Sequence, residues 1–193
     1  MPTPLESAQQ FISRFPGLIG EPVEFRGEVT IHVNDAERIA EVCSVAKKEF
    51  GFDFLVDVSS VDNYETAPRF SVVYELYNMT ARVHLRLRTD VSEEKAEVPT
   101  VTSVWRTANW HEREIYDMMG IRFRGHPDLR RILMWEGYPY FPLRKDFPLA
   151  GKPTVIPEVA FTRAAPLEGG PFVTVAGGKD TLVREPRSRE SQD

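Results

Sequence analysis

The chain has 193 residues, of which 41% are hydrophobic and 27% are charged, a composition typical of a folded domain rather than of a disordered chain. Its net charge of -5 argues against a general nucleic-acid binder, and its apolar runs are too short to cross a bilayer or to form a secretory signal. The single cysteine, Cys43, excludes an internal disulfide and does not suffice for a structural zinc or an iron–sulfur cluster.

The first fifty residues predict two helices with a hairpin between them. Apolar residues recur every three or four positions over residues 4–15, which indicates a short amphipathic helix. The stretch 21–33 alternates in polarity on both sides of an Arg-Gly pair, as hairpin strands do. A second helix is predicted over residues 34–50, with an asparagine or aspartate at its start. Because Cys43 lies on the apolar stripe of this helix, we expect it to be a small buried side chain.

Three strand-like runs follow, at residues 52–61, 69–78 and 81–89. Turn-forming residues separate them, so we expect an antiparallel meander with helices covering one of its faces. The predicted fold class is therefore α+β. It consists of a two-layer domain over residues 1–135, in which a mixed or antiparallel sheet is covered by helices.

The style of the sequence changes near Pro139. Eight of the fifteen prolines fall between Pro139 and Pro186, no helical period persists, and apolar residues remain spaced along the segment. An extended chain with apolar anchors is suited to a groove on another protein. We therefore interpret residues 136–193 as an extended proline-rich arm that wraps a partner subunit. The alternative is a coil packed over its own domain.

The stretch HEREIYDMMGIRFRGHPDLRRIL, residues 111–133, holds more than ten ionisable side chains among apolar ones. Asn109 and Glu112 have the spacing of a capping box, in which two side chains bond the free amides at the start of a helix. Gly120 can adopt the left-handed conformation that often ends one. The pattern predicts a helix of about ten residues between these signals.

This helix is predicted to carry Arg113, Glu114 and Asp117 on the face opposite its apolar residues. A zinc-protease helix would need a second histidine where this chain has Ile115, and no Glu-x-x-His motif of a di-iron site occurs. Glu114 and Asp117 have the spacing of an acid–base pair, but Arg113 would hold both ionised. We interpret the charged face as a surface that binds another protein; a merely solvated face is the alternative.

Residues 122–145 carry six basic and two acidic side chains, whereas the rest of the chain is acidic. A basic segment on an acidic body favours an acidic protein partner. RNA binding through this segment is the competing hypothesis, but the aromatic patterns of RNA-binding domains are missing.

These motifs resemble a known family. The stretch from Asn109 to Met134 is similar to the signature of the C subunit of the proton-pumping NADH–quinone oxidoreductase, respiratory complex I. Residues 142–148, PLRKDFP, resemble its second block, although Phe141 stands where the family often has histidine. The residues that match the signature, and that we predict to form the partner interface, are Glu112, Arg113, Glu114, Asp117, Gly120, Gly125, His126, Pro127, Arg130, Arg131, Arg144, Lys145 and Asp146.

The resemblance implies a structural subunit of the peripheral arm, with no catalytic, cofactor-binding or metal-binding residues of its own. Flavin, iron–sulfur clusters and quinone would be held by partner subunits, with the D and B subunits as direct neighbours. Membrane association would be indirect, at the cytoplasmic face of the bacterial inner membrane. The alternative is the equivalent subunit of a membrane-bound hydrogenase or of a related ferredoxin- or coenzyme-linked dehydrogenase. A stand-alone hydrolase using Glu114 and Asp117 is a hypothesis of another class.

Overall fold

The computed structural model describes residues 2–148 of the chain. They belong to two compact units: unit 1, which ends at Gly137, and unit 2, which begins at Tyr138. Most of the predicted arm, residues 149–193, lies outside the described residues, so its wrapping role stays a prediction.

The helices of unit 1 begin and end close to where periodicity predicted. Thr3 caps the first helix: its hydroxyl accepts a hydrogen bond from the amide of Glu6, whose carboxylate accepts one from the amide of Thr3. Asp35 caps the 3-10 turn that leads into the second helix. The helical segments of the described chain are α1 Pro4–Arg14, η1 Ala36–Arg38, α2 Ile39–Lys48 and α3 Ala108–Met119.

The main sheet has five strands in the order β1-β2-β5-β4-β3. The predicted hairpin (β1 and β2) and the predicted antiparallel meander (β3, β4 and β5) are both confirmed. The two halves join because β2 pairs with β5 in parallel, which makes the sheet mixed. The strands are β1 Val23–Phe25, β2 Glu28–Val33, β3 Phe54–Asp62, β4 Phe70–Asn78 and β5 Val83–Val91.

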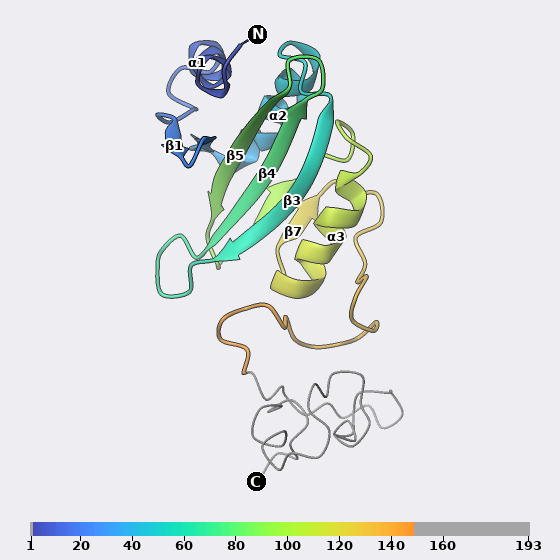
Figure 1. Ribbon diagram of the computed structural model, residues 1–193. Helices are drawn as coiled ribbons and strands as arrows, with labels where there is room; N and C mark the ends of the chain where they lie inside the picture. The colour runs from blue at the N-terminus through green and yellow to red at the C-terminus, as the bar shows by residue number, and fades with distance from the viewer. Residues whose placement is uncertain (1, 149–193) are drawn as a thin grey trace, which may run out of the picture. The chain divides into compact units, whose positions relative to one another are not determined.

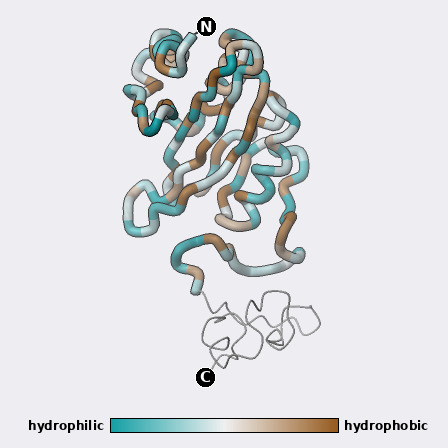
Figure 2. The backbone as a smooth tube through the Cα atoms, viewed as in Figure 1, coloured by the Kyte–Doolittle hydropathy of each residue, from teal (hydrophilic) through white to brown (hydrophobic). Residues whose placement is uncertain are grey.

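The core lies between one face of this sheet and the helices. Alternate residues of the central strands point inward, such as Tyr74 opposite Leu87, and each is fully buried. As viewed in Figure 1, α2 lies behind the sheet and α3 lies beside β3. Figure 2 shows the apolar residues concentrated along the central strands. Cys43 is fully buried in this core, as predicted.

The opposite face of the sheet is polar. Its side chains pair across neighbouring strands, as Arg86 does with Glu75, and His32 with Asp90 at 3.0 Å. The expectation that helices cover one face is therefore confirmed, and the alternation of polar and apolar residues along β5 follows from it.

Two further strands form a small parallel sheet next to α3. They are β6 Glu97–Pro99 and β7 Arg122–Arg124. In β7, Phe123 points inward and the two arginines are exposed, as the alternation of the sequence predicted. Nothing in the sequence indicated β6. The pairing holds the segment that follows α3 against the segment that precedes it.

Candidate functional site

The charged signature residues lie on α3 and on the segment that follows it. Helix α3 packs beside β3, and Ile115, Met118 and Met119 are buried in the core. His111 ties the outer side of the helix to the sheet, with its Nδ1 atom 3.0 Å from a carboxylate oxygen of Asp57. The helix is therefore fixed to the sheet before its charged side chains make any contact.

Glu112 is fully buried and reaches back to the loop before α3. One carboxylate oxygen accepts a hydrogen bond from the amide of Val101 at 2.7 Å, and the other accepts one from the hydroxyl of Thr100. The predicted capping box with Asn109 is therefore wrong. The helix already begins at Ala108 after a run of turns, so Glu112 is turned inward instead of toward its own N-terminus.

The surroundings of Glu112 change its acidity. Burial raises the pKa of Glu112 to about 7, because the bonds from Thr100 and Val101 only partly offset the loss of solvation. His126 lies nearby, with its Nε2 atom 3.9 Å from the Glu112 carboxylate, and both side chains are fully buried. Burial also lowers the pKa of His126.

His126 links α3 to the loop that follows β7. Its Nδ1 atom accepts a hydrogen bond from the amide of Asp128 at 3.0 Å, so in the neutral ring the proton is on Nε2. Nε2 then donates to the carbonyl of Asn109 at 3.2 Å. The histidine was predicted to be a hydrogen-bonding turn residue, and this is confirmed. Gly125, immediately before it, has a φ of 82°, a conformation that favours glycine.

Asp117 is fully buried and organises the segment after His126. One of its oxygens accepts hydrogen bonds from three successive amides, those of residues 132–134, at 3.0, 2.7 and 2.8 Å. The other pairs with the guanidinium of Arg131 at 2.5 Å. Burial alone would raise the pKa of Asp117, but these amides and Arg131 outweigh it, so the pKa is lowered.

Arg113 is also almost buried, with 8% of its surface exposed. Its Nε atom donates to the carbonyl of Arg130 at 3.2 Å, and its Nη2 atom donates to the carbonyl of Arg131 at 3.3 Å. The predicted exposed charged face is therefore wrong for Arg113 and Asp117, which do not pair with each other. Both hold the 130–134 segment against α3, and only Glu114 of the three predicted residues is exposed.

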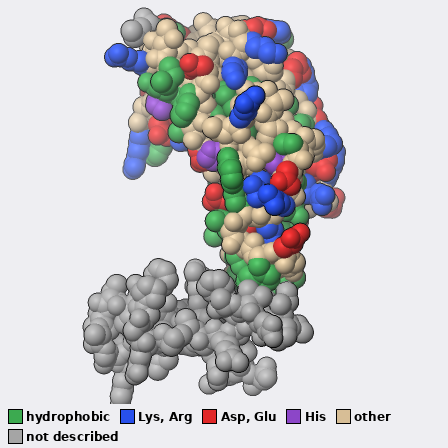
Figure 3. All heavy atoms as spheres, turned by 90° about the vertical axis from the view of Figure 1, so that its right-hand side faces the viewer, with side chains coloured by type: hydrophobic (Ala, Val, Ile, Leu, Met, Phe, Trp, Pro, Cys, Tyr) green, Lys and Arg blue, Asp and Glu red, His purple; other side chains and the backbone are tan. Residues whose placement is uncertain are grey.

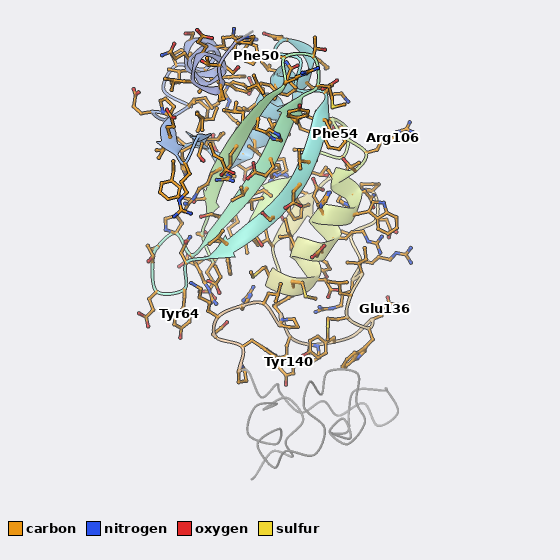
Figure 4. The ribbon with its side chains drawn as sticks, in the orientation of Figure 1. Phe50, Phe54, Tyr64, Arg106, Glu136 and Tyr140 are labelled. Atoms are coloured by element: carbon orange, nitrogen blue, oxygen red, sulfur yellow. The ribbon has the colours of Figure 1, made fainter. Side chains whose placement is uncertain are left out.

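The other signature residues in unit 1 are turn or surface residues. Gly120 ends α3 with a φ of 77°, as predicted. Pro127 and Arg130 are exposed, and Arg130 pairs with Asp128 at 2.9 Å. In Figure 4, Arg106 and Glu136, which precede and follow the signature in the chain, project outward.

The second block lies in unit 2. The guanidinium of Arg144 stacks on the ring of Phe141, 4.6 Å from its centroid, at the place where the family often has histidine. Lys145 and Asp146 are exposed. The amide of Phe147 donates to the carbonyl of Arg144 at 3.0 Å, which closes a turn over these residues.

The described residues offer little for chemistry. Residues 2–148 contain no group of three or more histidine, cysteine, aspartate or glutamate side chains placed to hold a metal ion. Asp117 is enclosed while Glu114 faces outward, so the two do not form an acid–base pair. No described helix is long and apolar enough to cross a membrane.

Residues 32–153 match the family described as the respiratory-chain NADH dehydrogenase 30 kDa subunit. This range covers more than half of the chain and includes the whole signature. The chain belongs to this family.

Curated relatives of this 30 kDa subunit share one name, that of the NADH-quinone oxidoreductase C subunit. The chain is 47% identical over 152 residues to the C subunit numbered 2 of Rhizobium etli, covering 75% of this chain and 81% of the relative. It is 56% identical over 117 residues to the protein of the same name from Rhizobium meliloti, covering 60% of this chain and 64% of the relative.

Solved structures share the fold of this 30 kDa subunit. A trypsin-resistant fragment of Nqo5 is 35% identical and superposes with a TM-score of 0.53, covering 65% of this chain and 96% of that one. A chain of a membrane-bound sulfane sulfur reductase, an archaeal respiratory membrane complex, has a TM-score of 0.65 at 24% identity and covers 75% of this chain and 85% of that one. The second likeness concerns the fold alone.

Proposed function

We propose that this chain is a structural subunit, without a cofactor of its own, in the peripheral arm of an NADH–quinone oxidoreductase. The observation that carries the proposal is the use of Glu112, Arg113 and Asp117. All three bond to loop backbone within the chain. Its densest group of ionisable side chains thus acts as an internal framework that shapes a surface, which supports a role in assembly.

The proposal includes the neighbours of the subunit. Electron transfer from NADH to quinone, coupled to proton translocation, would take place in partner subunits that hold flavin, iron–sulfur clusters and quinone. The D and B subunits are the proposed direct partners, and the complex would lie at the cytoplasmic face of the bacterial inner membrane. The exposed signature residues Glu114, Arg130, Lys145 and Asp146 are the ones available to these partners.

A related complex with another electron donor is the alternative. The fold shared with a chain of the sulfane sulfur reductase complex supports it, because such domains serve more than one respiratory complex. The 47% identity to an NADH-quinone oxidoreductase subunit, against 24% to the reductase chain, favours the first assignment.

Affinity purification of the tagged chain from its own membranes, in mild detergent, tests the proposal. We expect the D and B subunits to be recovered in amounts equal to the chain, together with flavin and NADH oxidation in the same particle. Recovery with nickel and without NADH oxidation would transfer the chain to a hydrogenase-type complex. A chain recovered alone, with a redox centre or a turnover of its own, would refute the structural role.

A further inference from the structure

Arg113 is a nearly buried cation without an anion. Its Nε and Nη2 atoms bond to carbonyl oxygens, and among the described residues no carboxylate lies within ion-pair distance of its guanidinium. Asp117, one turn further along α3, is paired with Arg131 instead. No described residue accepts a hydrogen bond from Nη1 of Arg113. Because a buried charge is costly unless it is paired, this arrangement is incomplete in the isolated chain.

Two exposed apolar side chains flank this cation. The ring of Trp110 lies over the Arg113 guanidinium at 5.2 Å and is 62% exposed. Leu133 is 61% exposed, and its amide is held by the Asp117 carboxylate at 2.7 Å. Arg113 connects the two, because it stacks on Trp110 and bonds to the backbone that leads into Leu133.

Trp110, Arg113 and Leu133 thus form a pre-ordered surface, which we call the Trp110–Leu133 patch. Buried hydrogen bonds fix its backbone, so binding there would cost little conformational entropy. Tryptophan and arginine are the residues that most often dominate the binding energy of protein interfaces. The side of unit 1 seen in Figure 3 carries hydrophobic, basic and acidic side chains close together, as interface surfaces do.

We propose that the Trp110–Leu133 patch is the docking site for a neighbouring subunit, which places an acidic side chain against Arg113 and an apolar side chain between Trp110 and Leu133. This inference rests on the proposed function, because it takes the partner from the same complex. The guanidinium decides the chemistry of the partner: a carboxylate supplies both the missing charge and acceptors for its free N–H groups. Glu114 does not fill this role, because adjacent residues of a helix do not face each other.

The test is retention of partner subunits by the tagged full-length chain, with two charge variants at one exposed position. Leu133→Glu places a carboxylate beside Arg113 and competes with the partner's acidic group, whereas Leu133→Lys removes the same apolar contact without competing. We expect Leu133→Glu to retain at least about tenfold less partner than Leu133→Lys, and Trp110→Ala to weaken retention by about tenfold or more. Phe25→Ala, which truncates an equally exposed side chain on β1, should retain the wild-type amount.

Two further measurements make the result decisive. Thermal unfolding of each purified full-length variant should match the wild type, because both altered side chains are exposed. A photo-crosslinker at position 110 should attach to a partner-subunit segment that contains aspartate or glutamate. Equal retention by the two Leu133 variants, or a crosslink within the chain or to a second copy of it, would overturn the proposal. If wild-type chain retains no partner at all, the proposed function fails instead.

Discussion

The free energy of unfolding of the full chain is expected to fall by about 3–5 kcal/mol when Asp117 is replaced with alanine, which is the usual cost of removing one member of a buried ion pair. The change would leave the guanidinium of Arg131 without its carboxylate and three backbone amides without an acceptor. The 130–134 segment would then lose its attachment to α3.

Denaturant unfolding of the purified full-length chain measures this effect. Glu114→Ala is the matched control, because Glu114 is exposed on the same helix and its loss should change stability by no more than about 0.5 kcal/mol. Because the pKa of Asp117 is lowered in the folded state, its contribution should be complete above its ordinary pKa and disappear as the pH falls through the folded-state pKa. A loss no greater than that of the Glu114 control would contradict the assigned role.

The second large effect concerns Glu112 and pH. Its pKa rises from 4.5 to about 7 on folding, so between these values the folded chain holds a proton that the unfolded chain has released. Stability should therefore decrease as the pH rises through this window, by about 3 kcal/mol for this group. Glu112→Gln should remove the decrease, because its amide oxygen can accept from Val101 and its amide nitrogen can donate to Thr100.

The measurement is the free energy of unfolding of both proteins between pH 4.5 and pH 8. His126 contributes with the opposite sign, because its pKa is lowered on folding and its neutral form loses stability as the pH falls. The difference between wild type and variant isolates Glu112. We expect similar stabilities near pH 5 and a more stable variant at pH 8. A variant that is less stable than wild type at pH 8 would show that the charged form of Glu112 is the one the fold favours.

The regular elements of the fold were predictable because their signals are local. Alternation over residues 81–89 places every second side chain in the core, and β5 follows it. The short strand β6 was not predictable, since it has three residues, includes Pro99 and is held by a parallel pairing with β7 far along the chain. The parallel contact of β2 with β5 has no local signal for the same reason.

The charged site was predicted to lie in the right segment but on the wrong side of the surface. Hydropathy treats every charged residue of a helix as exposed, yet Glu112 and Asp117 are fully buried because loop amides need acceptors there. That need depends on where residues 100–102 and 132–134 run, which the local sequence does not encode.

Capping signals show the same limit. The spacing of Thr3 and Glu6 forms a capping box, whereas the similar spacing of Asn109 and Glu112 does not. The chain enters α1 from an extended residue and enters α3 from a series of turns, so only the first start leaves amides for a reciprocal cap. Attention to Thr3 would have found the first box from sequence.

The most direct test of a structural rather than catalytic role is NADH–quinone turnover per assembled complex in cells that carry Glu112→Gln or Asp117→Asn. We expect the amount of assembled complex to fall for Asp117→Asn, while each complex that does assemble turns over within about twofold of wild type. Complexes that assemble in full but have lost turnover would contradict this account and place the signature residues in the chemistry.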